Sequence, residues 1–174
     1  MIADGPDAVR QRVREQLALG AAQIKLMAGG GVSSLYDPLD VTQYSPEEFR
    51  VAVEAAENWG TYVTVHAYTP RAIRFAIESG VKCIEHGQLA DEEVVKLMAA
   101  KGVWWSLQPF LDDEHANPKT GESRRKQLMV SEGTDRAYAL ARKHNVRTAW
   151  GTDVMHSPDG AAHAGAQLVK MTRW

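Results

Sequence analysis

Residues 61–68 read Thr61-Tyr62-Val63-Thr64-Val65-His66-Ala67-Tyr68, a run of β-branched and aromatic residues that ends in a histidine and a tyrosine. Such a run predicts a buried strand, because apolar residues alternate along it and Thr69-Pro70 begins a helix directly afterwards. The functional groups of His66 and Tyr68 are therefore expected at the C-terminal end of this strand.

A second segment, Val81-Lys82-Cys83-Ile84-Glu85-His86-Gly87, repeats the pattern of an apolar run, a terminal histidine and a turn. The same alternation continues along the chain, and each predicted helix stops at a glycine or a polar turn. The predicted strands cover 23–28, 61–68, 81–87, 103–107 and 146–150, and the predicted helices cover 8–19, 46–59, 70–79, 91–100, 131–144 and 161–171. This alternation predicts βα units and a parallel sheet, which is the α/β class.

A doubly wound sheet and a (β/α)₈ barrel both fit this alternation, and the positions of the polar residues favour the barrel. Lys25, His66, His86 and Asp153 all stand at or near the C-terminal ends of different predicted strands. Active sites of such barrels are built at that face, from the ends of several strands. Only five strands can be counted, whereas a whole barrel needs about 250 residues. We therefore predict a partial TIM-like barrel that forms one domain over residues 1–174.

Composition excludes several classes of partner. The chain has 174 residues, with 20 basic and 22 acidic side chains and a net charge of −2. It therefore lacks the excess of positive charge that is typical of proteins that bind nucleic acid or an anionic membrane. The single cysteine, Cys83, is expected to be a small buried hydrophobe. The chain contains no long apolar run and no signal peptide, which predicts a soluble protein and leaves its compartment open.

Each of the four strand-end residues has an ordinary structural explanation when taken singly, but their combination points to a metal. Two histidines and an aspartate are typical ligands of a divalent ion such as Zn²⁺. A lysine inside an apolar strand is expected to be buried, at a cost of several kcal/mol unless its charge is removed or paired. A lysine in such a place can also react with carbon dioxide to give a carbamate, whose oxygens are further ligands.

Four motifs resemble the amidohydrolase superfamily, in the order in which that family has them. They are Ile24-Lys25-Leu26-Met27-Ala28-Gly29-Gly30-Gly31-Val32, Val65-His66-Ala67-Tyr68-Thr69, Ile84-Glu85-His86-Gly87 and Trp150-Gly151-Thr152-Asp153. The resemblance covers nearly the whole chain. It is closest to the branch that holds imidazolonepropionase-like hydrolases and the dipeptidases that cleave before C-terminal proline or arginine.

The resemblance implies a role for each residue of the group. Lys25 would be the carboxylated lysine that bridges two metal ions, with His66 and His86 as further ligands. Asp153 would be a ligand and also the general base that takes a proton from the attacking water. Tyr68 would bind the substrate and polarise its scissile carbonyl or hold the oxyanion. The implied substrate is a small amide or a dipeptide.

The chain departs from this family in one respect, because it has no His-x-His motif of the kind that ends the family's first strand. It begins, by resemblance, at the third helix of the family barrel, so we expect a truncated chain with at most one well-formed metal site and low or no activity. His156 follows Asp153 closely and is a candidate substrate-binding residue. Open sheet edges, with apolar residues such as Ile24, Leu26 and Val146 exposed near them, would favour a homo-oligomer.

Two other interpretations remain open at this point. In one, Lys25 is a Schiff-base lysine of an aldolase-type barrel and Gly29-Gly30-Gly31 binds phosphate, although this leaves the histidines and Asp153 without a role. In the other, the chain is a folded or oligomeric fragment without turnover. The polar segment 108–121 is long for a connection and acidic, which fits either a cationic substrate or a solvated turn.

Overall fold

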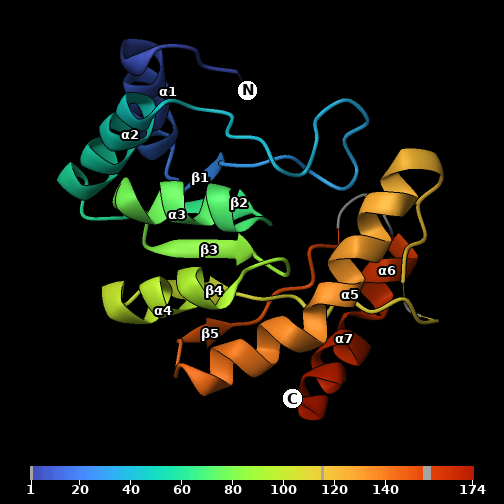
Figure 1. Cartoon of the computed structure of the whole chain (residues 1–174). Helices are drawn as coiled ribbons and strands as arrows, with labels where there is room; N and C mark the ends of the chain where they lie inside the picture. The colour runs from blue at the N-terminus through green and yellow to red at the C-terminus, as the bar shows by residue number, and fades with distance from the viewer. Residues whose placement is uncertain (1, 115, 155–157) are drawn as a thin grey trace.

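The computed structural model describes residues 2–114, 116–154 and 158–174, in which helices and strands alternate (Figure 1). The strands are β1 (Ile24–Met27), β2 (Val63–Ala67), β3 (Cys83–His86), β4 (Trp104–Ser106) and β5 (Thr148–Ala149). The helices are α1 (Pro6–Ala18), α2 (Pro46–Asn58), α3 (Pro70–Glu78), α4 (Glu92–Lys101), α5 (Gly121–Lys143), α6 (Pro158–Ala162) and α7 (Ala164–Lys170), followed by the 3₁₀ helix η1 (Met171–Arg173).

The five strands form one parallel sheet in the order β1-β2-β3-β4-β5, so each strand pairs with the next one in the sequence. Parallel neighbours require a crossover connection, and the helices α2 to α5 provide it here. The predicted α/β class, with five parallel strands and flanking helices of a partial barrel, is confirmed. Because the strands run the same way, all their C-terminal ends meet at one edge of the sheet (Figure 1).

The strand register separates an apolar face of the sheet from a polar one. Leu26 pairs with Val65, Val65 with Ile84 and Ile84 with Trp105, and the last three side chains are fully buried in the main hydrophobic core. Burying a side chain of the size of Ile84 contributes about 1.5–3 kcal/mol. The next row of partners, Met27, His66, Glu85 and Ser106, lies on the opposite face because successive side chains alternate.

Helix α2 begins as the sequence predicts, with a complete capping box. The Glu48 amide donates to Ser45 Oγ at 3.3 Å, and the Ser45 amide donates to Glu48 Oε2 at 2.7 Å. The other oxygen of Glu48 accepts a hydrogen bond from the Gly5 amide at 2.8 Å. One carboxylate therefore both starts α2 and holds the N-terminal end of α1 against it.

Helix α5 differs from the prediction, because it begins at Gly121 and not near residue 131. Residues 121–130 are mostly charged or long straight-chain side chains, which favour helix but lack the apolar spacing that predicts one. The first half of α5 therefore lies beyond the C-terminal ends of the strands (Figure 1). The predicted last helix is divided into α6, α7 and η1. No helix in the described part of the chain is long and apolar enough to cross a membrane.

Two expectations about burial are wrong. Lys25 is exposed, because it lies on the face of β1 that points away from the helices, whereas Ile24 on the other face is buried. Leu26 is half-buried and Val146 is buried, so neither leaves an apolar edge open. The large apolar side chains that are exposed near the sheet include Met27 and Trp104.

Candidate metal centre

Three aromatic rings gather where β2 and β3 end. The ring centroids of His66 and His86 lie 4.5 Å apart, and Tyr68 lies 4.9 Å from His66 and 5.1 Å from His86. All three residues are buried. Tyr68 also belongs to a small apolar cluster with Leu39 and Val130, which joins the loop after β1 to helix α5 above the strand ends.

His66 is held by the glycine-rich loop that follows β1. Its Nε2 lies 3.0 Å from the carbonyl oxygen of Gly30, which can only accept, so Nε2 carries the proton and donates it. Nδ1 is left with its lone pair. Burial lowers the pKa of His66, and the positive charge of Lys25 lowers it further. The hydrogen bond to the Gly30 carbonyl raises the pKa but does not outweigh burial. The ring is therefore neutral at pH 7, as a metal ligand must be.

His86 is held from the opposite side, by the segment that follows strand β4. Its Nδ1 lies 2.8 Å from Gln108 Oε1, and Gln108 Nε2 donates to the Ser106 carbonyl at 3.1 Å, which fixes the orientation of the amide. Nδ1 is therefore the donor, and Nε2 keeps its lone pair. Burial lowers the pKa of His86 well below its ordinary value, and the positive charges of Lys25 and of His66, when His66 is protonated, lower it further.

The backbone at His86 adopts a conformation that side chains usually avoid. Its φ is +75°, and the next residue, Gly87, has φ +77°. The buried indole of Trp105 donates from Nε1 to the His86 carbonyl at 2.6 Å, and a Cβ on Gly87 would come within 2.5 Å of the same nitrogen. Trp105 thus holds a turn that swings His86 toward His66. Positive φ in a residue other than glycine costs free energy and is found preferentially at functional sites.

Asp153 also has a positive φ, of +51°, and lies in the segment after β5. The residue is exposed as a whole. Neighbouring atoms nevertheless desolvate its carboxyl group, which raises the pKa of that group, and the charge of Lys25 opposes this shift. Burial raises the pKa of Tyr68 as well, and the charge of Asp153 adds to it. The charge of Asp153 thus acts on Tyr68, and the charge of Lys25 acts on Asp153.

The predicted site residues are thus placed as follows. His66, His86 and Tyr68 are in ring contact, and Lys25 and Asp153 act on them through charge. Among the described residues, no three His, Cys, Asp or Glu side chains lie close enough together to hold a metal ion. His156 lies outside the described residues, so its predicted role has no structural counterpart here. His144, expected to be structural, caps α5 and lies 2.9 Å from Glu92.

Three further residues shape the site in roles that the sequence did not predict. They are Gly30, Trp105 and Gln108, which hold the two imidazoles through a backbone carbonyl, an indole and an amide. Only Gln108 carries a signal that sequence reasoning could use, because it follows a strand end as the histidines do. Each of the other two acts through a contact that depends on the folded chain.

Comparison with known proteins agrees with this architecture. Residues 1–173 match the model of the amidohydrolase family. The ochratoxinase of Aspergillus niger is 38% identical over 156 residues, which are 87% of this chain and 32% of that protein. The crystal structure of A. niger ochratoxinase superposes with a TM-score of 0.86 at 35% identity, covering 99% of this chain and 39% of that one.

Two solved peptidases are also similar. A prolidase complexed with N-methylphosphonate-L-proline gives a TM-score of 0.91 at 36% identity, over 98% of this chain and 43% of that chain. A Xaa-Pro dipeptidase with methionine bound in the active site gives 0.85 at 29% identity, over 98% and 43%. The chain belongs to the amidohydrolase family. It spans about a third of the length of the curated relatives that it matches.

Proposed function

We propose that this chain carries part of the catalytic centre of a metal-dependent hydrolase that cleaves C–N bonds of amides or peptides. The observation that supports this most directly is the pair His66 and His86. Each ring has one nitrogen committed to a hydrogen bond, at 3.0 Å and 2.8 Å, and the other nitrogen left with its lone pair. In metal-binding histidines, a hydrogen bond from the ring nitrogen that does not bind the metal orients the ring in this way.

The chemistry of the donors suits a divalent ion of the zinc type, although within the described residues no third His, Cys, Asp or Glu side chain stands close enough to the two imidazoles to complete a site. Nδ1 of His66 and Nε2 of His86 would bind it, with oxygen ligands from Asp153 and from Lys25 after carboxylation. Such an ion, when bound, supplies a Lewis acid and an activated water nucleophile. In its neutral amine form Lys25 would carry the carbamate through a bond from Nζ to the carbon of carbon dioxide, with release of one proton to solvent; starting from the ammonium form, a second proton is released. Its exposure leaves it open to this small reagent.

Tyr68 and Asp153 are proposed to act on the reacting groups. The raised pKa of Tyr68 keeps its hydroxyl protonated, so it can donate a hydrogen bond to a scissile carbonyl and to the oxyanion that forms from it. The raised pKa of Asp153 makes its carboxylate a better proton acceptor than an ordinary aspartate. Asp153 would take a proton from the attacking water and pass it to the leaving nitrogen.

The structural neighbours support a substrate class. A prolidase and a Xaa-Pro dipeptidase superpose on this chain, so we propose a dipeptide or a similarly small amide as substrate. Since the chain lacks a His-x-His motif, we propose that it binds at most one ion well and that its own activity is low. We also propose that it forms a homo-oligomer, since β1 and β5 are the outer strands of the described sheet.

A turnover assay tests this proposal. The chain is incubated with zinc chloride, bicarbonate and an Xaa-Pro dipeptide, and free proline is measured. We expect slow release that a chelator stops and that Asp153→Asn abolishes. Asp135→Asn is the matched control, because Asp135 pairs with Arg173 on the surface. A chain that binds zinc but releases no proline would be a fragment without turnover, and the hydrolase proposal would be wrong for it.

A further inference from the structure

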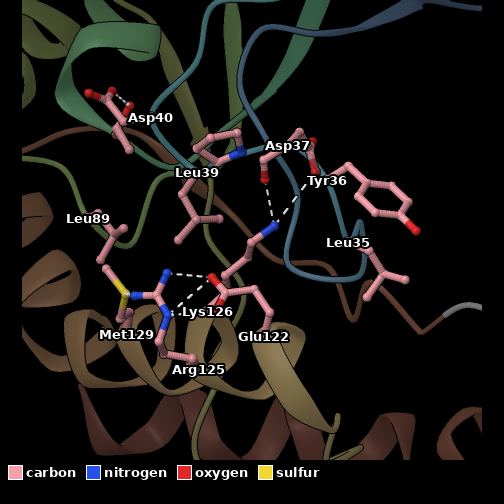
Figure 2. A pocket seen from close by; sticks show the side chains of 12 residues that line it. Leu35, Tyr36, Asp37, Leu39, Asp40, Leu89, Glu122, Arg125, Lys126 and Met129 are labelled. Carbon is pink, nitrogen blue, oxygen red and sulfur yellow. Dashed lines mark hydrogen bonds and ion pairs between the residues drawn. The ribbon is translucent and has the colours of Figure 1, made fainter.

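Lys126, on the first half of α5, has a buried ammonium group in contact with a distant loop. The side chain is only 3% exposed, and Nζ donates to the carbonyl oxygens of Gly31, Ser34 and Asp37 at 3.2, 2.7 and 2.6 Å. Figure 2 shows the side chain reaching from α5 toward Asp37. An ammonium has three protons to donate, so these three carbonyls satisfy it fully.

The charge of Lys126 also meets the carboxylate of Asp37. Within the described part of the chain, Asp37 Oδ1 is buried and makes no hydrogen bond, and it lies 3.7 Å from Lys126 Nζ. The other oxygen, Oδ2, accepts a hydrogen bond from the Gly31 amide at 3.0 Å. Buried charges are tolerated when they are paired in this way, and removing one partner of such a pair is strongly destabilising for the other.

The loop that Lys126 binds is the one that holds His66. Gly31, which is bonded to Lys126 through its carbonyl and to Asp37 through its amide, follows Gly30 directly. Gly30 in turn accepts the proton of His66 Nε2. The Gly30 amide contacts the Leu39 carbonyl at 3.4 Å, so the glycine is tied to the loop on both sides. A continuous set of contacts therefore runs from Lys126 through Asp37 and Gly31 to the imidazole.

We propose that Lys126 is a positioning residue for His66, which acts by fixing the Gly30 carbonyl and thereby the tautomer that leaves Nδ1 free. Without the ammonium, the three carbonyl oxygens would lose their common donor, and Asp37 Oδ1 would lose the positive charge beside it and keep only the bonds that its other oxygen accepts from Gly31 and Gln43. The loop would then move, and the His66 ring would lose the acceptor that selects its protonated nitrogen. The effect on metal affinity rests on the proposed function, whereas the effect on the tautomer does not.

The decisive variant is Lys126→Met, which keeps the approximate length of the side chain and removes its three donors. With ¹⁵N-labelled histidine and no metal, long-range ¹H–¹⁵N spectra at a pH where the ring is neutral report which nitrogen of His66 is protonated. We expect a single Nε2–H tautomer in the parent chain and a mixture in Lys126→Met. Zinc affinity should fall about 10- to 100-fold, the range for the loss of an outer partner of a ligating histidine.

Arg125→Met is the matched control, because the neighbouring Arg125 is exposed and pairs with Glu122 on the helix surface. It should change neither the tautomer nor the affinity. If Lys126→Met does not fold, Asp37→Leu disturbs the same loop from its own side and should shift the tautomer in the same direction. A folded variant of either kind with the parent tautomer would overturn the proposal. Failure of the parent chain to bind zinc would instead count against the metal site and leave the tautomer comparison decisive.

Discussion

His86 Nδ1 lies 2.8 Å from the side-chain oxygen of Gln108. His86 ends strand β3, whereas Gln108 lies in the segment that follows the neighbouring strand β4. The amide of Gln108 is fixed in turn by the Ser106 carbonyl at 3.1 Å. The orientation of a ligand candidate on β3 thus depends on the segment after β4. This arrangement resembles the outer partners that metal-binding histidines have in general.

Gln108→Leu removes the acceptor and keeps the approximate size of the side chain. We expect zinc affinity to fall about 10- to 100-fold, because the His86 ring loses the partner that selects its tautomer. Gln108→Glu keeps an acceptor oxygen for His86 but loses the donor to the Ser106 carbonyl, so we expect a smaller loss than for Gln108→Leu. Isothermal titration with zinc measures both. Equal affinities of the leucine and glutamate variants would contradict the role of this bond.

Removing either candidate ligand should abolish zinc binding. His66→Ala and His86→Ala each delete one of the two imidazoles whose rings lie 4.5 Å apart. His144→Ala is the control, since His144 contacts Glu92 at the end of α5. Elemental analysis after dialysis measures the zinc content. If all three variants hold the same amount as the parent chain, the metal is bound elsewhere.

Much of this site could be predicted from sequence, and the reason is geometric. The C-terminal ends of neighbouring parallel strands lie side by side, so a terminal histidine on each strand predicts a shared site. Regular alternation alone would put His66 and His86 on opposite faces of the sheet, and the positive-φ turn at His86 brings the two rings together, which no local pattern predicts. The register of β2 and β3 then fixes the offset, with Ala67 opposite His86. The start of α2 is predictable for a similar reason, because a capping box acts within four residues.

The rest depends on contacts that no local pattern encodes. Lys126 and Gly31 are 95 positions apart, and the charged beginning of α5 resembles a polar connection until the loop after β1 is placed against it. The predicted burial of Lys25 is wrong for a related reason. An isolated strand pattern does not say which of its two faces is covered, and Lys25 lies on the uncovered one.

The stability of the chain should fall in mildly acidic solution because of His86. Burial lowers its pKa well below the ordinary value of 6.5. Between that lowered pKa and 6.5 the unfolded state binds more protons, so the free energy of unfolding decreases as the pH falls. The stability that comes from keeping His86 neutral is fully present above pH 6.5, and it is lost as the pH falls toward the pKa of His86 in the folded state. Metal-free His86→Gln should show a smaller loss in urea unfolding between about pH 7 and pH 5, and parallel curves would contradict this.

Gly30 should tolerate no side chain. A Cβ at this position would lie 1.9 Å from the Pro38 carbonyl oxygen and 2.8 Å from the carbon that carries it, and a backbone group cannot move aside as a flexible side chain can. We expect Gly30→Ala to lower the free energy of unfolding by about 1–3 kcal/mol, in the range for overpacked sites. It should weaken zinc binding as well, because the displaced carbonyl is the acceptor of His66.

The matched variant for Gly30 is Gly165→Ala. Gly165 lies within α7, and a Cβ added there would meet no atom of the described residues within 4 Å, so alanine should be neutral or slightly stabilising through its helix propensity. Urea unfolding and zinc titration of both variants separate a local clash from a general intolerance of substitution. Similar losses in the two proteins would argue that the loop around Gly30 has no special role.

The last prediction concerns the sheet face that the helices do not cover. Trp104 is 43% exposed, and Met27 on the same face is 38% exposed. Both lie near outer strands of the described sheet, and exposed apolar surface beside unpaired strand edges favours association with a second chain. We therefore expect a homodimer or larger assembly at micromolar concentration.

Two tryptophan variants test whether this face forms the contact. Trp104→Glu should shift the assembly toward monomer, since the glutamate can pair with nearby Arg147 and keep the fold. Trp59→Glu changes another exposed tryptophan, at the end of α2, and should leave the assembly intact. Sedimentation velocity distinguishes these outcomes. A monomeric parent chain would show that this face needs no second copy, and equal dissociation of both variants would place the contact elsewhere.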